Sequence, residues 1–282
     1  MSASPSPRPR SAIVTRLRDA GCVFADDEAR LLVSAARTPA DLAVMVDRRA
    51  AGLPLEHVLG WAEFCGLRVA VDPGVFIPRR RTEFLVRQAT ALFRRTAGPA
   101  DQALARPRAV VVDLCCGSGA VGAALVAALD RVALYAVDID PAAVRCARRN
   151  IDAAGAQAYV GDLYQPLPAA LRGRVDVLVA NAPYVPTEAI RLLPPEARMH
   201  EPRMALDGGA DGLDVLRRVI AAAPLWLAPG GHLLVETSER QAPQTVDTVA
   251  RNGLIPRVAG SGELNATVVI GTRPATWSTS AS

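Results

Sequence analysis

The sequence predicts an α/β protein in which a Rossmann-like sheet, with helices on both faces, follows a small N-terminal helical domain and a linking β-hairpin. Three observations support this prediction. Short apolar stretches alternate with helical stretches in the second half of the chain, which is the pattern of βαβ units and a parallel sheet. One apolar stretch runs into a glycine-rich turn that opens a helix, as in loops that bind nucleoside cofactors. Residues 11–60 show helical periodicity alone.

The beginning of the chain divides into three parts. Residues 1–10 are rich in Ser, Pro and Arg and lead into no apolar signal core, so we expect a disordered leader. Residues 11–60 carry apolar side chains at three- and four-residue steps, which predicts the helical domain. Residues 61–80 are expected to form the hairpin linker. Apolar residues nearly alternate there, and Asp72-Pro73-Gly74 is expected to supply a turn.

Residues 81–273 are expected to form the larger domain, with a flexible tail at 274–282. A helix begins near Thr82, and a surface loop with Gly and Pro follows at 96–107. Strands are then predicted at 109–114, 132–137, 156–160 and 175–180, and helices at 120–129, 141–153 and 211–227. The last elements are a strand at 232–236, a helix at 241–252, and strands at 254–258 and 267–270. These last two strands are so closely linked that they can pair antiparallel.

Composition bears on the partners, the compartment, metal binding and membrane insertion. All 32 basic residues are arginine, and the net charge of +4 is too small for this length to identify a partner. The five cysteines form no Cys-x-x-Cys pair, which favours reduced thiols and a cytoplasmic location. The three histidines have no ligand spacing, so we expect no metal. The sequence contains no apolar stretch of roughly 18 residues, so no membrane span is predicted.

The glycine-rich loop is the first candidate site. An apolar strand ending at Leu114 leads into Cys115-Cys116-Gly117-Ser118-Gly119, where glycine lets a ligand approach the backbone. Asp138 follows Gly117 by 21 residues, at the end of the next predicted strand, and can accept hydrogen bonds from the hydroxyls of a ribose. These features predict a nucleoside cofactor. They fit a nicotinamide oxidoreductase and an S-adenosylmethionine-dependent methyltransferase equally well.

The second candidate site is Asn181-Ala182-Pro183-Tyr184, at the carboxyl end of a predicted strand. An amide nitrogen is a poor nucleophile because its lone pair is conjugated, as a rotation barrier of about 18–20 kcal/mol shows. Asn181 and a main-chain carbonyl of Ala182 or Pro183 can accept its two N–H groups, and Tyr184 can stack on the flat group. The tetrapeptide therefore favours methyl transfer to a planar nitrogen. Two substrates remain open, a glutamine side chain and an adenine amine in DNA or RNA. A catalytically silent binding protein also remains open.

Several stretches resemble the HemK/PrmC family of protein-(glutamine-N5) methyltransferases. The similarity covers most of the chain from about Pro54 to Ile270. Beside the two candidate sites, the matching stretches are Pro54 to Gly60, Phe64-Cys65-Gly66, Phe76-Ile77-Pro78-Arg79 through Thr82-Glu83, Glu201-Pro202, Ala205 to Leu213, Leu227 to Gly231, Glu236 and Gln241.

This resemblance implies a class I S-adenosylmethionine methyltransferase sheet in residues 81–273 and a definite set of site residues. The cofactor would be bound by Cys115, Cys116, Gly117, Ser118, Gly119, Asp138, Leu163 and Asn181. The substrate glutamine would be bound by Asn181, Ala182, Pro183 and Tyr184, with Asn181, Pro183 and Tyr184 catalytic.

The resemblance also implies the partner. The usual substrate of the family is the Gly-Gly-Gln loop of a peptide chain release factor, and the N-terminal helices would help to dock it. We expect a monomer in the cytoplasm that binds no nucleic acid directly.

Overall fold

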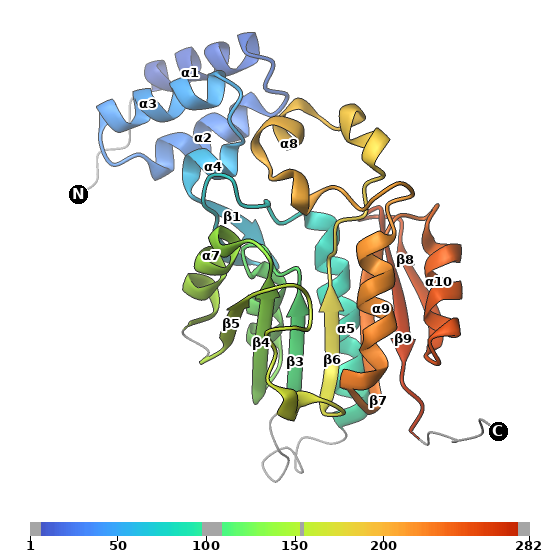
Figure 1. Ribbon diagram of the computed structural model, residues 1–282. Coiled ribbons are helices and arrows are strands. Elements are labelled where there is room, and N and C mark those ends of the chain that lie inside the picture. The colour runs from blue at the N-terminus through green and yellow to red at the C-terminus, as the bar shows by residue number, and fades with distance from the viewer. Residues whose placement is uncertain (1–6, 98–108, 153–154, 276–282) are drawn as a thin grey trace, which may run out of the picture.

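A computed structural model describes residues 7–97, 109–152 and 155–275 (Figure 1). Its main feature is a seven-stranded sheet in the order β5-β4-β3-β6-β7-β9-β8. The strands are β3 (Ala109–Leu114), β4 (Val132–Asp138), β5 (Gln157–Val160), β6 (Val175–Ala180), β7 (Leu227–Thr237), β8 (Ile255–Ser261) and β9 (Ala266–Thr272). Strands β3 to β7 pair in parallel, and β9 is antiparallel to both of its neighbours. The predicted Rossmann-like α/β fold is confirmed.

The chain order of the strands reverses between β3 and β6. From β3 the chain proceeds outward to β4 and β5, then returns to place β6 on the other side of β3. The carboxyl ends of strands at such a reversal leave a crevice in which ligands bind. Leu114 of β3 pairs with Val137 of β4 and with Ala180 of β6, so these three strands end in register.

Two apolar cores lie on the two faces of the sheet because successive strand residues point to opposite sides. Val177 and Val179 of β6 belong to one core, and Leu178 and Ala180 belong to the other. The first core is covered by α5 (Glu83–Ala97), α6 (Ala120–Ala128) and α7 (Pro141–Ile151). The second is covered by α9 (Asp214–Trp226) and α10 (Ala242–Arg251). Figure 1 shows α9 in front of the sheet and α5 behind it.

The predicted strands from 109 to 180 agree with the structure to within one residue. Strand β7 instead begins at Leu227, five residues before the predicted start. Leu227 pairs with Val175 across an irregularity in the ladder, and the turn-forming Pro229-Gly230-Gly231 hid this extension. Most of the predicted loop at 96–107 lies outside the described residues, and α5 continues to Ala97.

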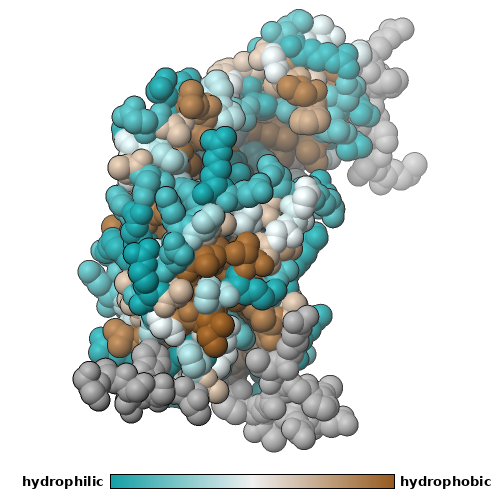
Figure 2. All heavy atoms as spheres, turned by 90° about the vertical axis from the view of Figure 1, so that its right-hand side faces the viewer, coloured by the Kyte–Doolittle hydropathy of each residue, from teal (hydrophilic) through white to brown (hydrophobic). Residues whose placement is uncertain are grey.

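The last two strands pair antiparallel, as the sequence predicts. Strand β9 lies inside the sheet, between β7 and β8, and β8 forms the edge. Viewed from this side, the surface is mainly hydrophilic and its apolar groups are interspersed with hydrophilic ones (Figure 2).

The N-terminal part is helical, with α1 (Pro7–Asp19), α2 (Ala25–Ala35), α3 (Pro39–Ala50) and α4 (Leu55–Leu59). These helices share a small core of their own, which includes Leu17, Leu32 and Val46. Because α1 starts at Pro7, the last four residues of the expected leader are helical; residues 1–6 lie outside the described part of the chain. The helices lie beside α8 (Pro195–His200), beyond the carboxyl ends of the parallel strands (Figure 1).

The hairpin is formed by β1 (Trp61–Phe64) and β2 (Leu67–Ala70). Its turn is Cys65-Gly66, and the expected turn at Asp72-Pro73-Gly74 comes after β2. Both Cys65 (φ 50°) and Gly66 (φ 75°) are left-handed, as a two-residue hairpin turn with the correct twist requires. The Asp-Pro-Gly stretch makes a separate turn after β2, closed by a hydrogen bond of 3.0 Å from the Val75 N–H to the Asp72 carbonyl.

Arg49 connects the helical part to the rest of the molecule. Its Nε and Nη2 donate to the two carboxylate oxygens of Glu28, at 2.6 and 3.1 Å, and both side chains are buried. Its Nη1 donates to Glu196 of α8 at 2.7 Å and to the Leu53 carbonyl at 3.0 Å. One buried guanidinium therefore links α2, α3 and α8.

Replacing Arg49 with Met should lower the free energy of unfolding by about 3–5 kcal/mol, because the Glu28 carboxylate would remain buried without its partner. Urea denaturation followed by circular dichroism measures this loss. Arg16→Met is the control, since Arg16 pairs with Asp47 at the exposed surface of the same helices and should cost no more than about 1 kcal/mol. Equal losses in the two variants would contradict a larger contribution of the buried pair to the free energy of unfolding.

Candidate active site

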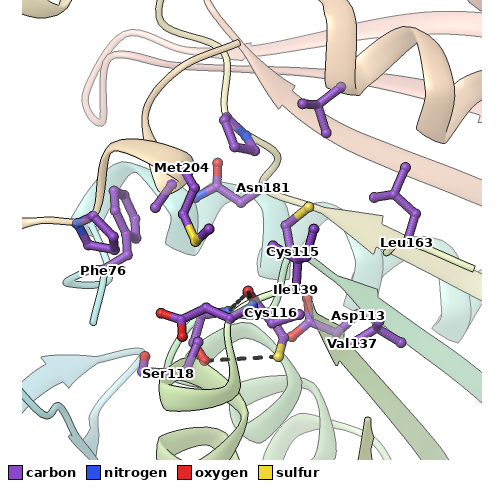
Figure 3. A pocket seen from close by; sticks show the side chains of 18 of the residues that line it. Phe76, Asp113, Cys115, Cys116, Ser118, Val137, Ile139, Leu163, Asn181 and Met204 are labelled. Carbon is purple, nitrogen blue, oxygen red and sulfur yellow. Dashed lines mark hydrogen bonds between the residues drawn. The ribbon is translucent and has the colours of Figure 1, made fainter. Parts of the chain in front are cut away.

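A cavity of about 300 Å³ lies at the carboxyl ends of β3, β4 and β6 (Figure 3). Since Leu114, Val137 and Ala180 stand in one row, the residues that follow them lie at the same edge of the sheet. These residues are Cys115, Asp138 and Asn181, and all three line the cavity. The register of the sheet therefore brings the two predicted sites into one cavity.

The glycine-rich loop turns sharply as it leaves β3. Cys115 (φ 56°), Gly117 (φ 53°) and Gly119 (φ 77°) all adopt left-handed backbone conformations. Cys115, Cys116, Gly117 and Ser118 line the cavity. Burial raises the pKa of both cysteine thiols, so the two side chains are neutral.

Gly119, also predicted to bind the cofactor, does not line the cavity. It caps the N-terminus of α6 and packs against α7, where a Cβ atom would lie 2.9 Å from the Cβ of Ala147. The glycine is needed because the two helices approach so closely. Its contribution to the site is to place the helix that follows the loop.

Asp138 is held in place by the backbone. Its Oδ2 accepts a hydrogen bond of 2.8 Å from the Gly117 N–H, and its Oδ1 accepts one of 2.9 Å from the Asp140 N–H. Burial raises the pKa of this carboxyl group, and the two backbone donors oppose that rise. Each oxygen keeps a second lone pair for a ligand hydroxyl. The geometry thus suits the predicted role toward a ribose.

The remaining predicted cofactor contact, Leu163, also lines the cavity and has a left-handed backbone (φ 49°). Apolar walls come from Leu163, Phe76, Ile139 and Met204, of which Ile139 and Met204 are exposed. Figure 3 shows Phe76, Met204 and Asn181 on one side of the cavity and Cys116 and Ser118 on the other.

The tetrapeptide divides into residues inside and outside the cavity. Asn181 and Pro183 line it, whereas Ala182 is fully buried behind the lining. The Asn181 Nδ2 donates to Thr82 Oγ1 at 3.3 Å, which leaves its Oδ1 as a hydrogen-bond acceptor. Tyr184 is outside the lining, so its stacking on a substrate stays a prediction.

Tyr184 instead belongs to a polar network. Its hydroxyl donates to Glu236 Oε1 at 3.0 Å, and its carbonyl accepts a bond of 2.9 Å from Gln241 Nε2. Burial, followed by the nearby Glu236 charge, raises the pKa of the phenol. The ring is therefore fixed in position and its hydroxyl keeps its proton.

The segment from residue 185 to residue 207, which follows the tetrapeptide and contains α8, borders the cavity and is called the roof below. Pro202, Met204 and Ala205 line the cavity from this segment. Glu201, at the end of α8, is buried and accepts two hydrogen bonds of 2.6 Å from Arg79 Nη2, one on each oxygen. The roof is thus attached by an ion pair to the linker that follows the hairpin.

Sequence reasoning left several lining residues without a role. Asp113 could have been found, because it lies on β3 directly before the glycine-rich loop. Thr82 stands in the Ile-Pro-Arg-x-x-Thr-Glu stretch but received no function. Met204 carries no sequence signal, since it reaches the cavity only through the path of the roof.

The cavity suits a cationic ligand of moderate size. Among the described residues, five aspartates and one arginine line it, and this arginine, Arg218, pairs with Asp162 at 2.5 Å. Its volume is at the lower end of the range for small-molecule sites, about 300–1,000 Å³. A cofactor that carries an adenosine, an ammonium and a sulfonium group fits this combination of acidic and apolar walls.

Two expected absences concern the same described residues. Within residues 7–97, 109–152 and 155–275, no group of three or more His, Cys, Asp or Glu could hold a metal ion. In this part of the chain, no helix combines the length and apolar character of a membrane span.

Comparison with known proteins identifies similar chains. A family model described as "Methyltransferase small domain" matches residues 69–195. The release factor glutamine methyltransferase of Geobacter sulfurreducens is 41% identical over 211 residues, which cover 74% of this chain and 69% of that protein. The protein of the same name from Moorella thermoacetica is 42% identical over 207 residues, covering 73% and 69%.

A solved structure supports the fold. The 16S rRNA N2 G1207 methyltransferase of T. thermophilus, in complex with AdoMet and guanosine, is similar with a TM-score of 0.51 and 18% identity. The similarity covers 76% of this chain and 49% of that chain.

Asp113 should make stability depend on pH. Burial, with a smaller effect of Asp138, raises its pKa from 3.8 to about 7, against a hydrogen bond from the Gly122 N–H. Between about pH 4 and pH 7, the folded state therefore holds a proton on Asp113 that the unfolded state has lost. The free energy of unfolding of the wild type falls as pH rises through this range. Asp113→Asn should thus become more stable relative to the wild type between pH 5 and pH 8. Urea denaturation at both values measures the difference, and a constant difference would contradict the raised pKa.

Proposed function

The chain belongs to the family of release factor glutamine methyltransferases, and we propose that it methylates N5 of a glutamine in the Gly-Gly-Gln loop of a peptide chain release factor. S-adenosylmethionine is the methyl donor. One observation carries the proposal: Asn181 and Pro183 face the same acidic cavity as the glycine-rich loop and Asp138. A planar nitrogen and a sulfonium cofactor can meet only where both sets of residues are in reach.

The cofactor is held by the set named from the sequence: Cys115, Cys116, Gly117, Ser118, Gly119, Asp138, Leu163 and Asn181. The carboxylate of Asp138 accepts hydrogen bonds from the ribose, and the loop backbone and Leu163 surround the remainder. Gly119 acts through the placement of α6. The acidic lining favours the positive charge of the cofactor over its neutral product, which assists release.

Asn181, Ala182, Pro183 and Tyr184 bind the glutamine. The Asn181 Oδ1 accepts one N–H of the substrate amide, and the main-chain carbonyl of Ala182 or Pro183 accepts the other. When bound, S-adenosylmethionine supplies a methyl group whose C–S bond breaks as the N–C bond forms, and one amide proton passes to solvent. Holding the nitrogen in line with the methyl group supplies much of the rate enhancement. No separate acid or base is required.

The enzyme acts as a cytoplasmic monomer that contacts its protein substrate and no nucleic acid. Its five cysteines are all free, which agrees with a reducing compartment. The helical domain of residues 11–60 helps to dock the release factor. Light scattering with and without a release factor tests both the monomer and the complex.

Asn181→Ala should lower kcat by about 100-fold, because one preorganised partner of the reacting amide is lost. The assay follows labelled methyl transfer from S-adenosylmethionine to a release factor, with mass spectrometry of the Gly-Gly-Gln peptide. Asn252→Ala, in an asparagine near the end of α10 and remote from the cavity, is the matched control and should keep wild-type kcat.

Two results would overturn the proposed substrate. A release factor in which the glutamine is replaced by alanine should take up no label, and equal labelling would move the reaction elsewhere. Label found in DNA or RNA instead would establish the adenine amine as the acceptor.

A further inference from the structure

The short turn Arg80–Thr82 contacts both ends of the tetrapeptide, although about 100 residues separate them in sequence. Thr82 accepts a hydrogen bond from Asn181, the first residue of the tetrapeptide. Arg81 lies over the ring of Tyr184, the last residue, with its Cζ 5.6 Å from the ring centroid. The same Arg81 donates through Nε to Glu236 Oε1 at 3.1 Å, the atom that accepts the Tyr184 hydroxyl.

The hydrogen bond to Thr82 restrains the Asn181 carboxamide. A half-turn of this group exchanges its oxygen and nitrogen, and only one orientation presents an acceptor to the substrate N–H. In the structure Nδ2 bonds to Thr82 Oγ1, a side chain that is 2% exposed, and Oδ1 is left for the substrate. A buried hydroxyl at this position can hold the carboxamide still by a hydrogen bond, and a methyl group cannot.

The contact at Glu236 holds the other end. This residue is 1% exposed, at the carboxyl end of β7. Among the described residues its Oε1 serves both Arg81 and Tyr184, while its buried Oε2 has no hydrogen-bond partner. Burying a carboxylate with one oxygen unpaired costs free energy, so packing alone does not account for the residue. The bond from the Tyr184 hydroxyl to Oε1 gives the carboxylate a role in holding Tyr184.

We propose that Thr82 and Glu236 are positioning residues for the methyl transfer: Thr82 orients the carboxamide of Asn181, and Glu236, together with Arg81, holds Tyr184. This inference rests on the proposed function of the tetrapeptide. Both residues act on the geometry of the substrate nitrogen. Their loss should therefore lower kcat and leave the affinity for S-adenosylmethionine nearly unchanged.

The first test compares Thr82→Val with Thr82→Ser. Valine has the shape of threonine without the hydroxyl, and kcat should fall about tenfold, the equivalent of one hydrogen bond. Serine restores the hydroxyl and should recover most of the rate. Thr90→Val is the matched control, since Thr90 lies on the adjoining α5 and its buried hydroxyl has no partner among the described residues. An unchanged kcat in Thr82→Val would overturn the role of Thr82.

Coupling between the residues separates positioning from a general loss of stability. If Thr82 acts through Asn181, then Thr82→Val causes no further loss of kcat when introduced into Asn181→Ala. A second tenfold loss in that background would show that Thr82 acts by another route. Calorimetric binding of S-adenosylmethionine to Thr82→Val should match the wild type, and a tenfold weaker affinity would also contradict the proposal.

Glu236 is tested against its partner Tyr184. Glu236→Gln keeps the shape of the side chain, and Tyr184→Phe removes only the hydroxyl. Each should lower kcat, and the double variant should be no slower than the slower single variant. Independent, multiplying losses would refute the view that Glu236 acts through Tyr184.

An observation without turnover keeps this inference separate from the proposed function. In 15N-labelled protein, the side-chain amide resonance of Asn181 is identified by its loss in Asn181→Ala. It should shift in Thr82→Val and stay nearly unchanged in Thr90→Val. If the wild type methylated no release factor, the proposed substrate would fail. The amide resonance would then decide the position of Asn181 by itself, and an unshifted signal would overturn the contact.

Discussion

The parallel pairing of β3 with β4 and β6 is the constraint on which the active site depends. Leu114 stands beside both Val137 and Ala180, so three chain segments reach this edge of the sheet at the same level. The residue after each of them faces one cavity. A slip of one position would turn these strands' side chains to the opposite faces of the sheet and separate Cys115, Asp138 and Asn181. The two apolar cores prevent such a slip, because each accepts alternate residues of every central strand.

The cavity gathers carboxyl groups at this edge. Asp113 and Asp138 are both held by backbone N–H groups, and burial raises the pKa of each. Such an arrangement costs stability in the absence of a ligand, and a cationic cofactor offsets that cost when it binds. Functional sites are the places where a fold tolerates a conflict of this kind. The acidic lining and the left-handed loop therefore have a common explanation in the binding of a positively charged nucleoside.

The surroundings of the tetrapeptide come from distant parts of the chain. Residues 79–82 supply Arg79, Arg81 and Thr82, the segment after the tetrapeptide supplies the roof, and β7 supplies Glu236. The helical part reaches the roof through Arg49 and Glu196. The helices are thus connected to the cavity by buried or half-buried ion pairs.

Sequence periodicity could predict the sheet because burial on both faces demands continuous apolar strands, and the central strands were located to within one residue. The choice of turn at the hairpin could not be predicted in the same way. Asp72-Pro73-Gly74 carries the stronger local signal, yet Cys65-Gly66 makes the turn because the pairing of Trp61 with Ala70 requires it. Local preference was overruled by the register of the two strands.

By itself the sequence predicted the fold class and identified the glycine-rich loop, Asp138 and the tetrapeptide as candidate site residues. These predictions depend on residue types at short spacing. Only the tertiary structure decided that Gly119 serves helix packing, that Tyr184 turns toward Glu236 and that Thr82 meets Asn181. The physical reason is the same in each case. Those roles depend on contacts between residues far apart in sequence, and the direction of a side chain is set by the packing of segments whose mutual position no local pattern records.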